Sequence, residues 1–254
     1  VVGDEAGTAI STGDQITAVG YQAGAAMATN SQSSFFGYQA GLATTGPGNN
    51  FFGTFAGKAN TSGVNNVAMG NLALSTNIDG DDNTAIGSNA LRTLEPADGS
   101  SYNTAVGSQA GFAVTTGIQN TLIGGLAGDA LTDADRNVAI GYSSLSSDTL
   151  GSYSVAIGRS ALSAQNFTTA TDAYNTAVGS AAGGAVTTGI QNTLIGGLAG
   201  DSLTDADKNV AFGYAALTAD TLGSRSVAIG NNALNAQNFT TATNTYNTAV
   251  GNNA

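Results

Sequence analysis

The residues of this chain best suited to chemistry are aspartates that occur in pairs, one residue apart. Three segments contain such a pair, each followed by an asparagine: Asp79/Asp81, Asp133/Asp135 and Asp205/Asp207. Clustered carboxylate and amide oxygens are ligands that Ca²⁺ favours. However, neither EF-hand spacing nor the Gly-Gly-x-Gly-x-Asp repeat of calcium-binding β-rolls surrounds these pairs. Aspartate also caps turns without a metal, so we expect turn capping, with calcium binding as the alternative.

The composition removes most routes to catalysis. The chain has no histidine and no cysteine, so it has neither a Ser-His-Asp triad nor disulfides or thiolate chemistry. Glutamate occurs only at Glu5 and Glu95, and no pattern indicates the paired carboxylates of a glycoside hydrolase. We therefore expect no enzymatic activity, no cofactor and no metal. The alternative in this class is a carbohydrate-active enzyme similar to phage tailspikes, many of which are solenoids.

Aromatic side chains are better candidates for binding sugars, because their faces stack on sugar rings. Six of them lie just after a recurring glycine or in enlarged loops: Tyr21, Tyr38, Tyr142, Tyr214, Phe167 and Phe239. Packing across turns or against a partner chain is the simpler interpretation of these rings.

The charge balance limits the partners. Six Lys and Arg against seventeen Asp and Glu give a net charge of −11, which repels nucleic acid and anionic membranes. No apolar run is long enough to span a bilayer. We expect no nucleic-acid partner, and membrane attachment only through regions outside this chain.

A short motif that recurs fifteen times must position all of these residues. In most copies it reads Asn or Ser, Thr or Val, Ala, a large apolar residue and Gly, followed by two variable residues, Ala, and Gly or Leu. We number these positions one to nine. The position-five glycines are 16 or 17 residues apart, except for three intervals of 20 or 21. A period this short predicts a single repeat domain over residues 1–254, built as an all-β parallel solenoid of about fifteen turns.

The alternation of a strand predicts which positions share a face. Positions two and four are β-branched or apolar, as in Thr104 and Val106, and we assign them to the interior of the coil. Position three, usually Ala as in Ala105, Ala156 and Ala177, then faces outward. Because a strand that is apolar on both faces is usually covered on both, we expect a partner copy of this chain to cover position three.

Other positions predict the rest of the turn. A left-handed conformation is expected at the position-five glycine and again at Ser/Thr-rich corners such as Thr187-Thr188-Gly189. A second short strand is expected around the alanine at position eight. The Asn or Ser at position one should form a ladder, with side-chain amides bonding from turn to turn.

A longer repeat of four turns is superimposed on the motif, in blocks 33–102, 103–174 and 175–246, with partial turns at both ends. Residues 103–174 align with 175–246 without gaps and differ at fifteen positions. Position nine follows the same rhythm, as Gly111, Gly128, Leu145 and Leu162.

Each block also contains one enlarged loop, at residues 92–102, 163–174 and 235–246. Loops on a rigid scaffold commonly carry function, and repeated loops can bind a repetitive surface multivalently. The ligand-binding candidates are Asn166, Phe167, Thr168, Asn238, Phe239 and Thr240. A harmless insertion, or a loop that braces a neighbouring subunit, is the alternative.

Repeats such as Asn103-Thr104-Ala105-Val106-Gly107 and Ser154-Val155-Ala156-Ile157-Gly158 resemble the head repeats of trimeric autotransporter adhesins and the tail-fibre-like trimeric surface fibres of bacteria. The resemblance covers nearly the whole chain, although these turns are longer than the usual family repeat. It implies a left-handed parallel β-roll that assembles as a homotrimer. It further implies an extracellular adhesive head or shaft at the bacterial cell surface, in an outer membrane-associated fibre that attaches to glycans or protein receptors and has no catalytic role.

An ice-binding solenoid is a further alternative, because such proteins display flat threonine arrays. Here Thr alternates irregularly with Val at position two. We also expect these threonines to point inward, which disfavours ice binding.

Overall fold

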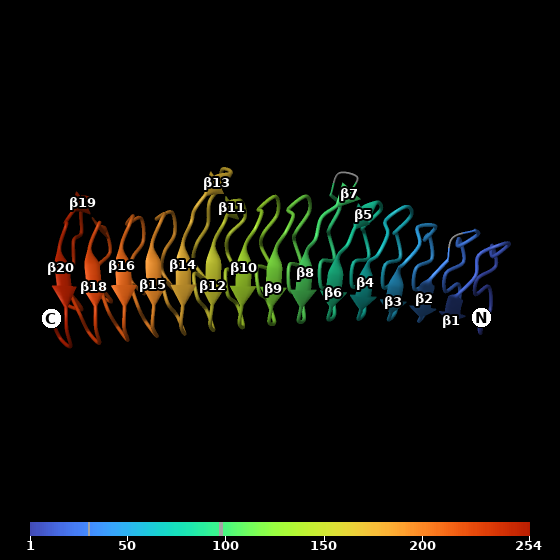
Figure 1. Cartoon of the computed structure of the whole chain (residues 1–254), viewed down its shortest axis with the longest axis horizontal. Helices are drawn as coiled ribbons and strands as arrows, with labels where there is room; N and C mark the ends of the chain where they lie inside the picture. Colours follow the sequence, from blue (N-terminus) through green and yellow to red (C-terminus); the bar gives the residue numbers. More distant parts are fainter. Residues whose placement is uncertain (30, 97–98) are drawn as a thin grey trace. The chain divides into compact units, whose positions relative to one another are not determined.

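The computed structural model describes residues 1–29, 31–96 and 99–254, and these residues form an all-β parallel solenoid without helices. The chain divides into two compact units, Val1–Gly125 and Leu126–Ala254. In each unit one short strand per turn stacks on the strand of the next turn (Figure 1). The predicted β-solenoid is therefore confirmed.

In the first unit the stacked strands follow each other in chain order. They are β1 (Ile16–Val19), β2 (Ser33–Phe36), β3 (Asn50–Phe52), β4 (Val67–Met69), β6 (Thr84–Ile86), β8 (Thr104–Val106) and β9 (Thr121–Ile123). The second unit has β10 (Val138–Ile140), β12 (Val155–Ile157), β14 (Thr176–Val178), β15 (Thr193–Ile195), β16 (Val210–Phe212), β18 (Val227–Ile229) and β20 (Thr248–Val250). Equivalent motif positions pair with each other, as Ala156 does with Ala177, so each position forms a column along its unit.

The assignment of the two strand faces from the sequence was wrong. Ala105, Ala156 and Ala177 at position three are fully buried inside the coil. Positions two and four, such as Thr176 and Ile229, are partly or largely exposed. The coil is narrow, so the inward position three is alanine in most turns, and a larger residue such as Leu194 fits there only beside position-nine glycines. The position-two threonines therefore face outward. The inward orientation predicted for them was one argument against ice binding, and that argument no longer holds.

The interior is filled by positions three, eight and nine and by the residue three places after position nine, such as Val114 and Leu203. Where position three is large, as in Leu194, the neighbouring position-nine residues are Gly183 and Gly200. Where position three is Ala156, position nine is Leu162, and both are fully buried. Where both positions are small, as in Ala177 and Gly183, the side chains of Leu162 and Leu194 from the turns on either side extend over the glycine. Adjacent turns therefore share the interior volume, as close packing requires.

The predicted second strand around position eight is absent from the described turns. Residues 108–113, for example, form a turn, with φ of 59° at both Gln109 and Gly111. Left-handed residues on both sides of position eight are incompatible with an extended strand. Additional two-residue strands instead form pairs beside the enlarged loops: β5 (Gly80–Asp81) with β7 (Gly99–Ser100), β11 (Gly151–Ser152) with β13 (Thr171–Asp172), and β17 (Gly223–Ser224) with β19 (Thr243–Asn244).

The corner glycines serve a different purpose from the one predicted. Gly189 is not left-handed, but a Cβ atom there would lie 2.3 Å from the carbonyl oxygen of Ala206 in the next turn. The left-handed residue of this corner comes two positions later, at Gln191 with φ 60°. Glycine is thus required at the corner for close approach of two backbones rather than for its φ angle.

The asparagine ladder at position one is confirmed. The Oδ1 atom of Asn175 accepts the backbone N–H of Asn192 at 2.9 Å, and Oδ1 of Asn192 accepts that of Asn209 at 3.0 Å. Their Nδ2 atoms donate to the carbonyls of Gly189 and Ala206, both at 2.7 Å. All three asparagines are fully buried. The ladder therefore satisfies polar backbone groups that strand pairing alone leaves without partners.

Candidate binding surfaces

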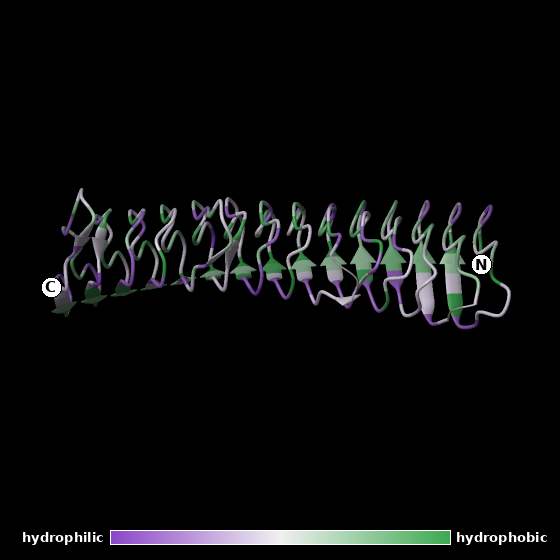
Figure 2. Ribbon diagram, turned by 90° about the horizontal axis from the view of Figure 1, so that it is seen from above, coloured by the Kyte–Doolittle hydropathy of each residue, from purple (hydrophilic) through white to green (hydrophobic). Residues whose placement is uncertain are grey.

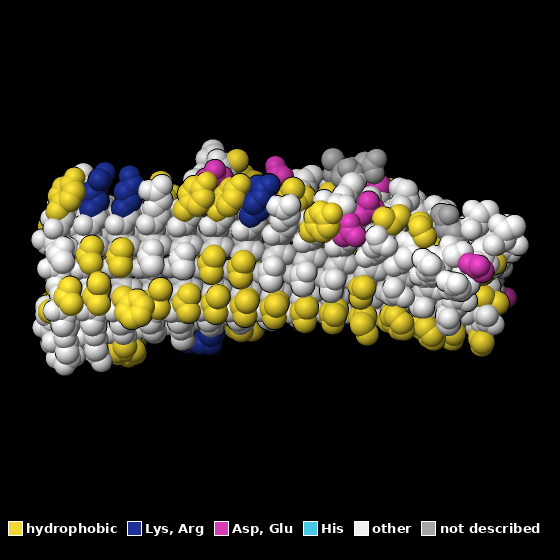
Figure 3. All heavy atoms as spheres, viewed as in Figure 1, with side chains coloured by type: hydrophobic (Ala, Val, Ile, Leu, Met, Phe, Trp, Pro, Cys, Tyr) yellow, Lys and Arg dark blue, Asp and Glu magenta, His cyan; other side chains and the backbone are white. Residues whose placement is uncertain are grey.

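The outer face of the stacked strands is a column of apolar side chains. In the second unit the position-four column consists of Ile140, Ile157, Val178, Ile195, Phe212, Ile229 and Val250, and in the first of Val19, Phe36, Phe52, Met69, Ile86, Val106 and Ile123. Phe212 is 53% exposed and Met69 42%. Figure 2 shows apolar strand segments in the first unit, and Figure 3 shows rows of apolar side chains in each unit. Contiguous exposed apolar side chains are typical of a surface that another molecule covers.

Aromatic rings stack from turn to turn within this outer surface. The rings of Phe36 and Phe52 are 4.9 Å apart and nearly parallel. Of the tyrosines predicted to contact sugars, Tyr21 and Tyr38 stack at 5.3 Å. Tyr142 and Tyr214 are 59% and 56% exposed. The nearby Glu5 carboxylate raises the pKa of Tyr21, so this hydroxyl keeps its proton, and remains a hydrogen-bond donor, to higher pH than an ordinary tyrosine.

A second column of exposed side chains, which was not predicted from the sequence, contains aromatic rings. It is formed by the residue just before position one, here called position zero, which in the second unit is Arg136, Tyr153, Tyr174, Gln191, Lys208, Arg225 and Tyr246. The position-zero column places rings and cations together: Arg136 lies 5.3 Å from the centre of the Tyr153 ring, which stacks on Tyr174 at 5.2 Å. Asp172 beside Tyr174 raises the pKa of that hydroxyl.

The signal for this column was present in the sequence as Tyr102, Tyr174 and Tyr246, which recur every 72 residues. Their exposure could not be read from the sequence, because it follows from the left-handed backbone at position zero, with φ near 52°. Exposed rings with neighbouring hydrogen-bonding groups are suited to contact with sugars.

Hydrogen bonds from buried polar residues hold two of the enlarged loops against the coil. Asp148 and Gln165 are fully buried, and Gln165 Nε2 donates to Asp148 Oδ2 at 2.6 Å. Asp148 Oδ1 accepts the backbone N–H of Gly151 at 3.1 Å and of Phe167 at 3.0 Å. Asp220 and Gln237 repeat this arrangement in the next block, where Asp220 accepts the N–H of Phe239 at 2.9 Å. The aspartate thus fixes the start of the loops at residues 163–174 and 235–246.

These hydrogen bonds determine which of the predicted ligand-binding residues in the loops are accessible. Phe167 is only 6% exposed, so its ring is not available for stacking on a sugar. Asn166 and Thr168 on either side of it are exposed, as are Asn238 and Thr240, whereas Phe239 is half-buried. The loop at residues 92–102 lies partly outside the described residues.

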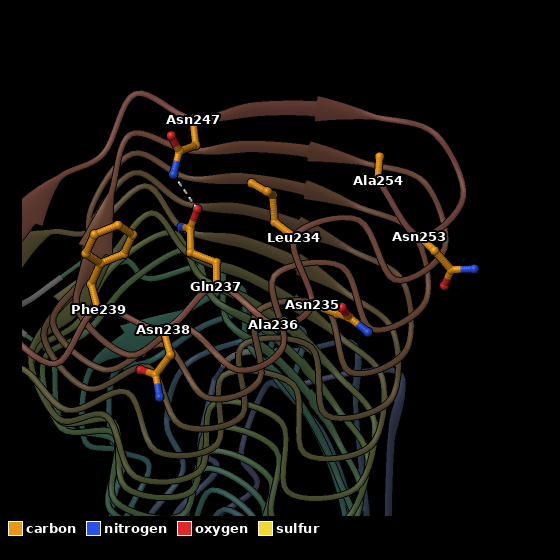
Figure 4. A pocket seen from close by; sticks show the side chains of 9 residues that line it. All are labelled: Leu234, Asn235, Ala236, Gln237, Asn238, Phe239, Asn247, Asn253 and Ala254. Carbon is orange, nitrogen blue, oxygen red and sulfur yellow. Dashed lines mark hydrogen bonds between the residues drawn. The ribbon is translucent and has the colours of Figure 1, made fainter.

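One cavity of about 480 Å³ lies at the last turn of the second unit. Leu234, Gln237, Phe239 and Asn247 line it, and Gln237 accepts a hydrogen bond from Asn247 (Figure 4). One block earlier the equivalent Leu162 and Gln165 are fully buried. The cavity is therefore a continuation of the coil interior and not a separate ligand pocket.

Asp81 and Asp207, each a member of one of the aspartate pairs, join successive turns of the coil rather than capping their own turn as predicted. Asp81 Oδ1 accepts the backbone N–H of Val64 at 2.7 Å, and Asp207 Oδ1 that of Ile190 at 2.8 Å. Within residues 1–29, 31–96 and 99–254 no group of three or more acidic side chains is arranged to hold a metal ion. Burial, and secondarily Asp79, raises the pKa of Glu95.

A comparison with protein-family models finds no match to this chain, and a comparison with curated proteins finds none either. The described residues contain no helix long and apolar enough to cross a membrane.

Proposed function

We propose that this chain is a head or shaft segment of an extracellular homotrimeric fibre that attaches to cell-surface glycans or receptors and has no catalytic role. The observation that carries the proposal is the exposed position-four column. An isolated chain would leave this column in water in both units, and a second and third copy would cover it. Burying a large apolar side chain contributes about 1.5–3 kcal/mol, so even partial burial of a column of this length supports assembly.

The number of chains and the location at a bacterial surface follow from the resemblance of the repeats to trimeric adhesins and surface fibres. In that arrangement the strand faces the partner subunits. The outward position of Val155 and Ile157 supports such an arrangement, with the contact made by positions two and four rather than by position three.

Adhesion is supported by the exposed rings of the position-zero column and of Tyr142 and Tyr214. They recur along the second unit, and repeated weak contacts with a glycan-covered surface add up to strong attachment.

The assembly is tested by placing charge on the strand face. In the variant Ile157→Glu, Ile195→Glu, Phe212→Glu, each new carboxylate would be buried in the trimer without a partner, which is strongly unfavourable. We expect a monomer by light scattering, with the β-sheet circular dichroism of the parent chain retained. The control Ser147→Glu, Ala236→Glu alters exposed turn residues and should keep the parent mass. A folded strand-face variant that still has the mass of a trimer would contradict the proposal.

A further inference from the structure

Two of the enlarged loops carry the same acceptor sequence for N-linked glycosylation, Asn-x-Thr with a middle residue other than proline. The tripeptides are Asn166-Phe167-Thr168 and Asn238-Phe239-Thr240. We propose that Asn166 and Asn238 are modification sites that carry N-linked glycans. The inference is compatible with the proposed extracellular location, and it does not depend on trimer formation.

The asparagine side chains are oriented for modification. Asn166 is exposed, and its Oδ1 atom accepts a hydrogen bond from the Thr149 hydroxyl at 3.2 Å. Asn238 has the same contact with Thr221 at 3.4 Å. Each threonine hydroxyl has a single proton and also donates it to the carbonyl of the phenylalanine that follows the asparagine, at 2.8 Å in both loops. The amide oxygen thus lies beside the coil, and the nitrogen, the atom that takes the sugar, has no partner among the described residues. Figure 4 shows the Asn238 amide pointing away from Gln237 and Asn247.

The middle residue explains why both flanking side chains are presented together. The backbone N–H of Phe167 is held by the buried Asp148 at 3.0 Å, and its ring is only 6% exposed. Asn166 and Thr168 are therefore displayed on either side of an anchored residue, and both are exposed. The Thr168 side chain forms no hydrogen bond within the described residues, so its hydroxyl is free for recognition by a transferase.

A third acceptor tripeptide provides an internal contrast. Asn60-Thr61-Ser62 has the required sequence, but Asn60 is fully buried. Its Nδ2 atom donates to the carbonyl of Gly63 at 2.9 Å, and its Oδ1 atom accepts from Asn77 at 2.8 Å. Modification of Asn60 would require the core of its turn to open. In the folded chain only the two loop asparagines are therefore expected to react.

The transfer needs a glycosyltransferase and an activated sugar donor, either a lipid-linked or a nucleotide-linked sugar phosphate. The Asn166 Nδ2 atom forms a bond to the anomeric carbon of the sugar while the bond from that carbon to the phosphate oxygen breaks. The phosphate leaves with the bonding electron pair, and one amide proton passes to a base of the transferase. No oxidation or reduction takes place.

The test uses the full folded chain, incubated with an Asn-x-Thr glycosyltransferase that accepts folded proteins and with its sugar donor, followed by peptide mapping by mass spectrometry. The expected result is sugar on the peptides containing Asn166 and Asn238 and none on the peptide containing Asn60. Thr168→Ala should abolish modification of Asn166 and leave Asn238 modified. The matched control Thr169→Ala should change neither.

The same map on protein from its natural host should show the glycan mass on both loop peptides. Bare loop peptides in the host protein would overturn the proposal, as would modification of Asn60 at the rate of Asn166 in the folded chain. Light scattering on the Thr168→Ala variant separates this inference from the trimer proposal, because loss of the glycan should leave the mass of the protein assembly unchanged.

Discussion

Single glycines decide whether successive turns can stack. Gly179 at position five has φ 142°, and a Cβ atom there would lie 2.4 Å from the carbonyl oxygen of Gly196 in the next turn. Both the backbone conformation and the space therefore exclude other residues. The recurrence of this glycine predicted its special conformation, whereas the close approach of the next turn became evident only from the structure.

We expect Gly179→Ala to lower the free energy of unfolding by at least about 1–3 kcal/mol, because it adds backbone strain and a steric clash. Thermal and urea denaturation measure this change. The control is Gly184→Ala, five residues along the chain, where φ is not in the left-handed region and the nearest atom to a new Cβ is 3.3 Å away. Equal losses for the two variants would contradict this account of position five.

Burial also perturbs a carboxyl group of the second unit. Asp129 is partly buried and its Oδ1 atom has no hydrogen-bond partner in the structure, and the loss of hydration raises its pKa. One block later the equivalent Asp201 accepts a hydrogen bond from the Thr218 hydroxyl. Because burial favours the protonated carboxyl, Asp129 favours the folded chain most at a pH below its pKa in the unfolded chain. This contribution to stability is lost as the pH rises through its raised pKa in the folded chain.

Asp129→Asn should therefore stabilise the chain at pH 7, by less than about 1 kcal/mol because the group remains partly solvated. The gain should shrink as the pH falls into the range where an ordinary aspartate becomes protonated. Denaturation of both proteins across this pH range provides the measurement, and Asp201→Asn, which loses a charged acceptor, should show no gain. A stabilisation independent of pH would rule out the ionised carboxylate as its cause.

At the scale of the turn, packing depends on the volumes of positions three and nine in adjacent turns. Leu194 extends toward the space above Gly183 and Gly200, and a Cβ atom at Gly200 would lie 2.8 Å from both Leu194 and Leu203. Other turns reach a similar volume with Ala at position three and Leu at position nine, where the leucine keeps the same left-handed backbone, as Leu162 does at φ 48°.

A double-mutant cycle tests this exchange. Leu194→Ala alone should cost about 2–5 kcal/mol through the cavity that it leaves, and Gly200→Leu alone about 1–3 kcal/mol through overpacking. Together they recreate the Ala and Leu combination of neighbouring turns. The double variant should be more stable than the sum of the single changes predicts, by at least about 0.5 kcal/mol in denaturant unfolding. Strict additivity would show that the two positions do not share one space.

The strand positions and the asparagine ladder could be predicted because both depend on local alternation and on a fixed period. The inward and outward faces could not, because hydrophobicity alone suggested that Val106 and Ile157 were inside. The width of the coil decided otherwise. The burial of Phe167 was equally hidden, since its partner Asp148 lies in the preceding turn, 19 residues earlier.

At the scale of the whole molecule, the chain combines a coil that satisfies its own backbone with an outer strand face that lacks a cover. The position-three alanines complete the coil of a single chain, and the position-four column is free to join chains. Asn166 and Asn238 in two of the enlarged loops, and tyrosines such as Tyr142, are exposed on the same turns as the strand face. In the proposed fibre, assembly and adhesion would therefore use different residues of one turn.

The most direct test of this account is the solution mass of the unmodified chain, measured by light scattering at several concentrations. One chain has a mass of 24.9 kDa, and we expect a stable species of three times that value. A monomer that stays soluble with its strand face exposed would contradict the trimeric fibre and would favour a surface that works alone, such as an ice-binding or glycan-cleaving solenoid.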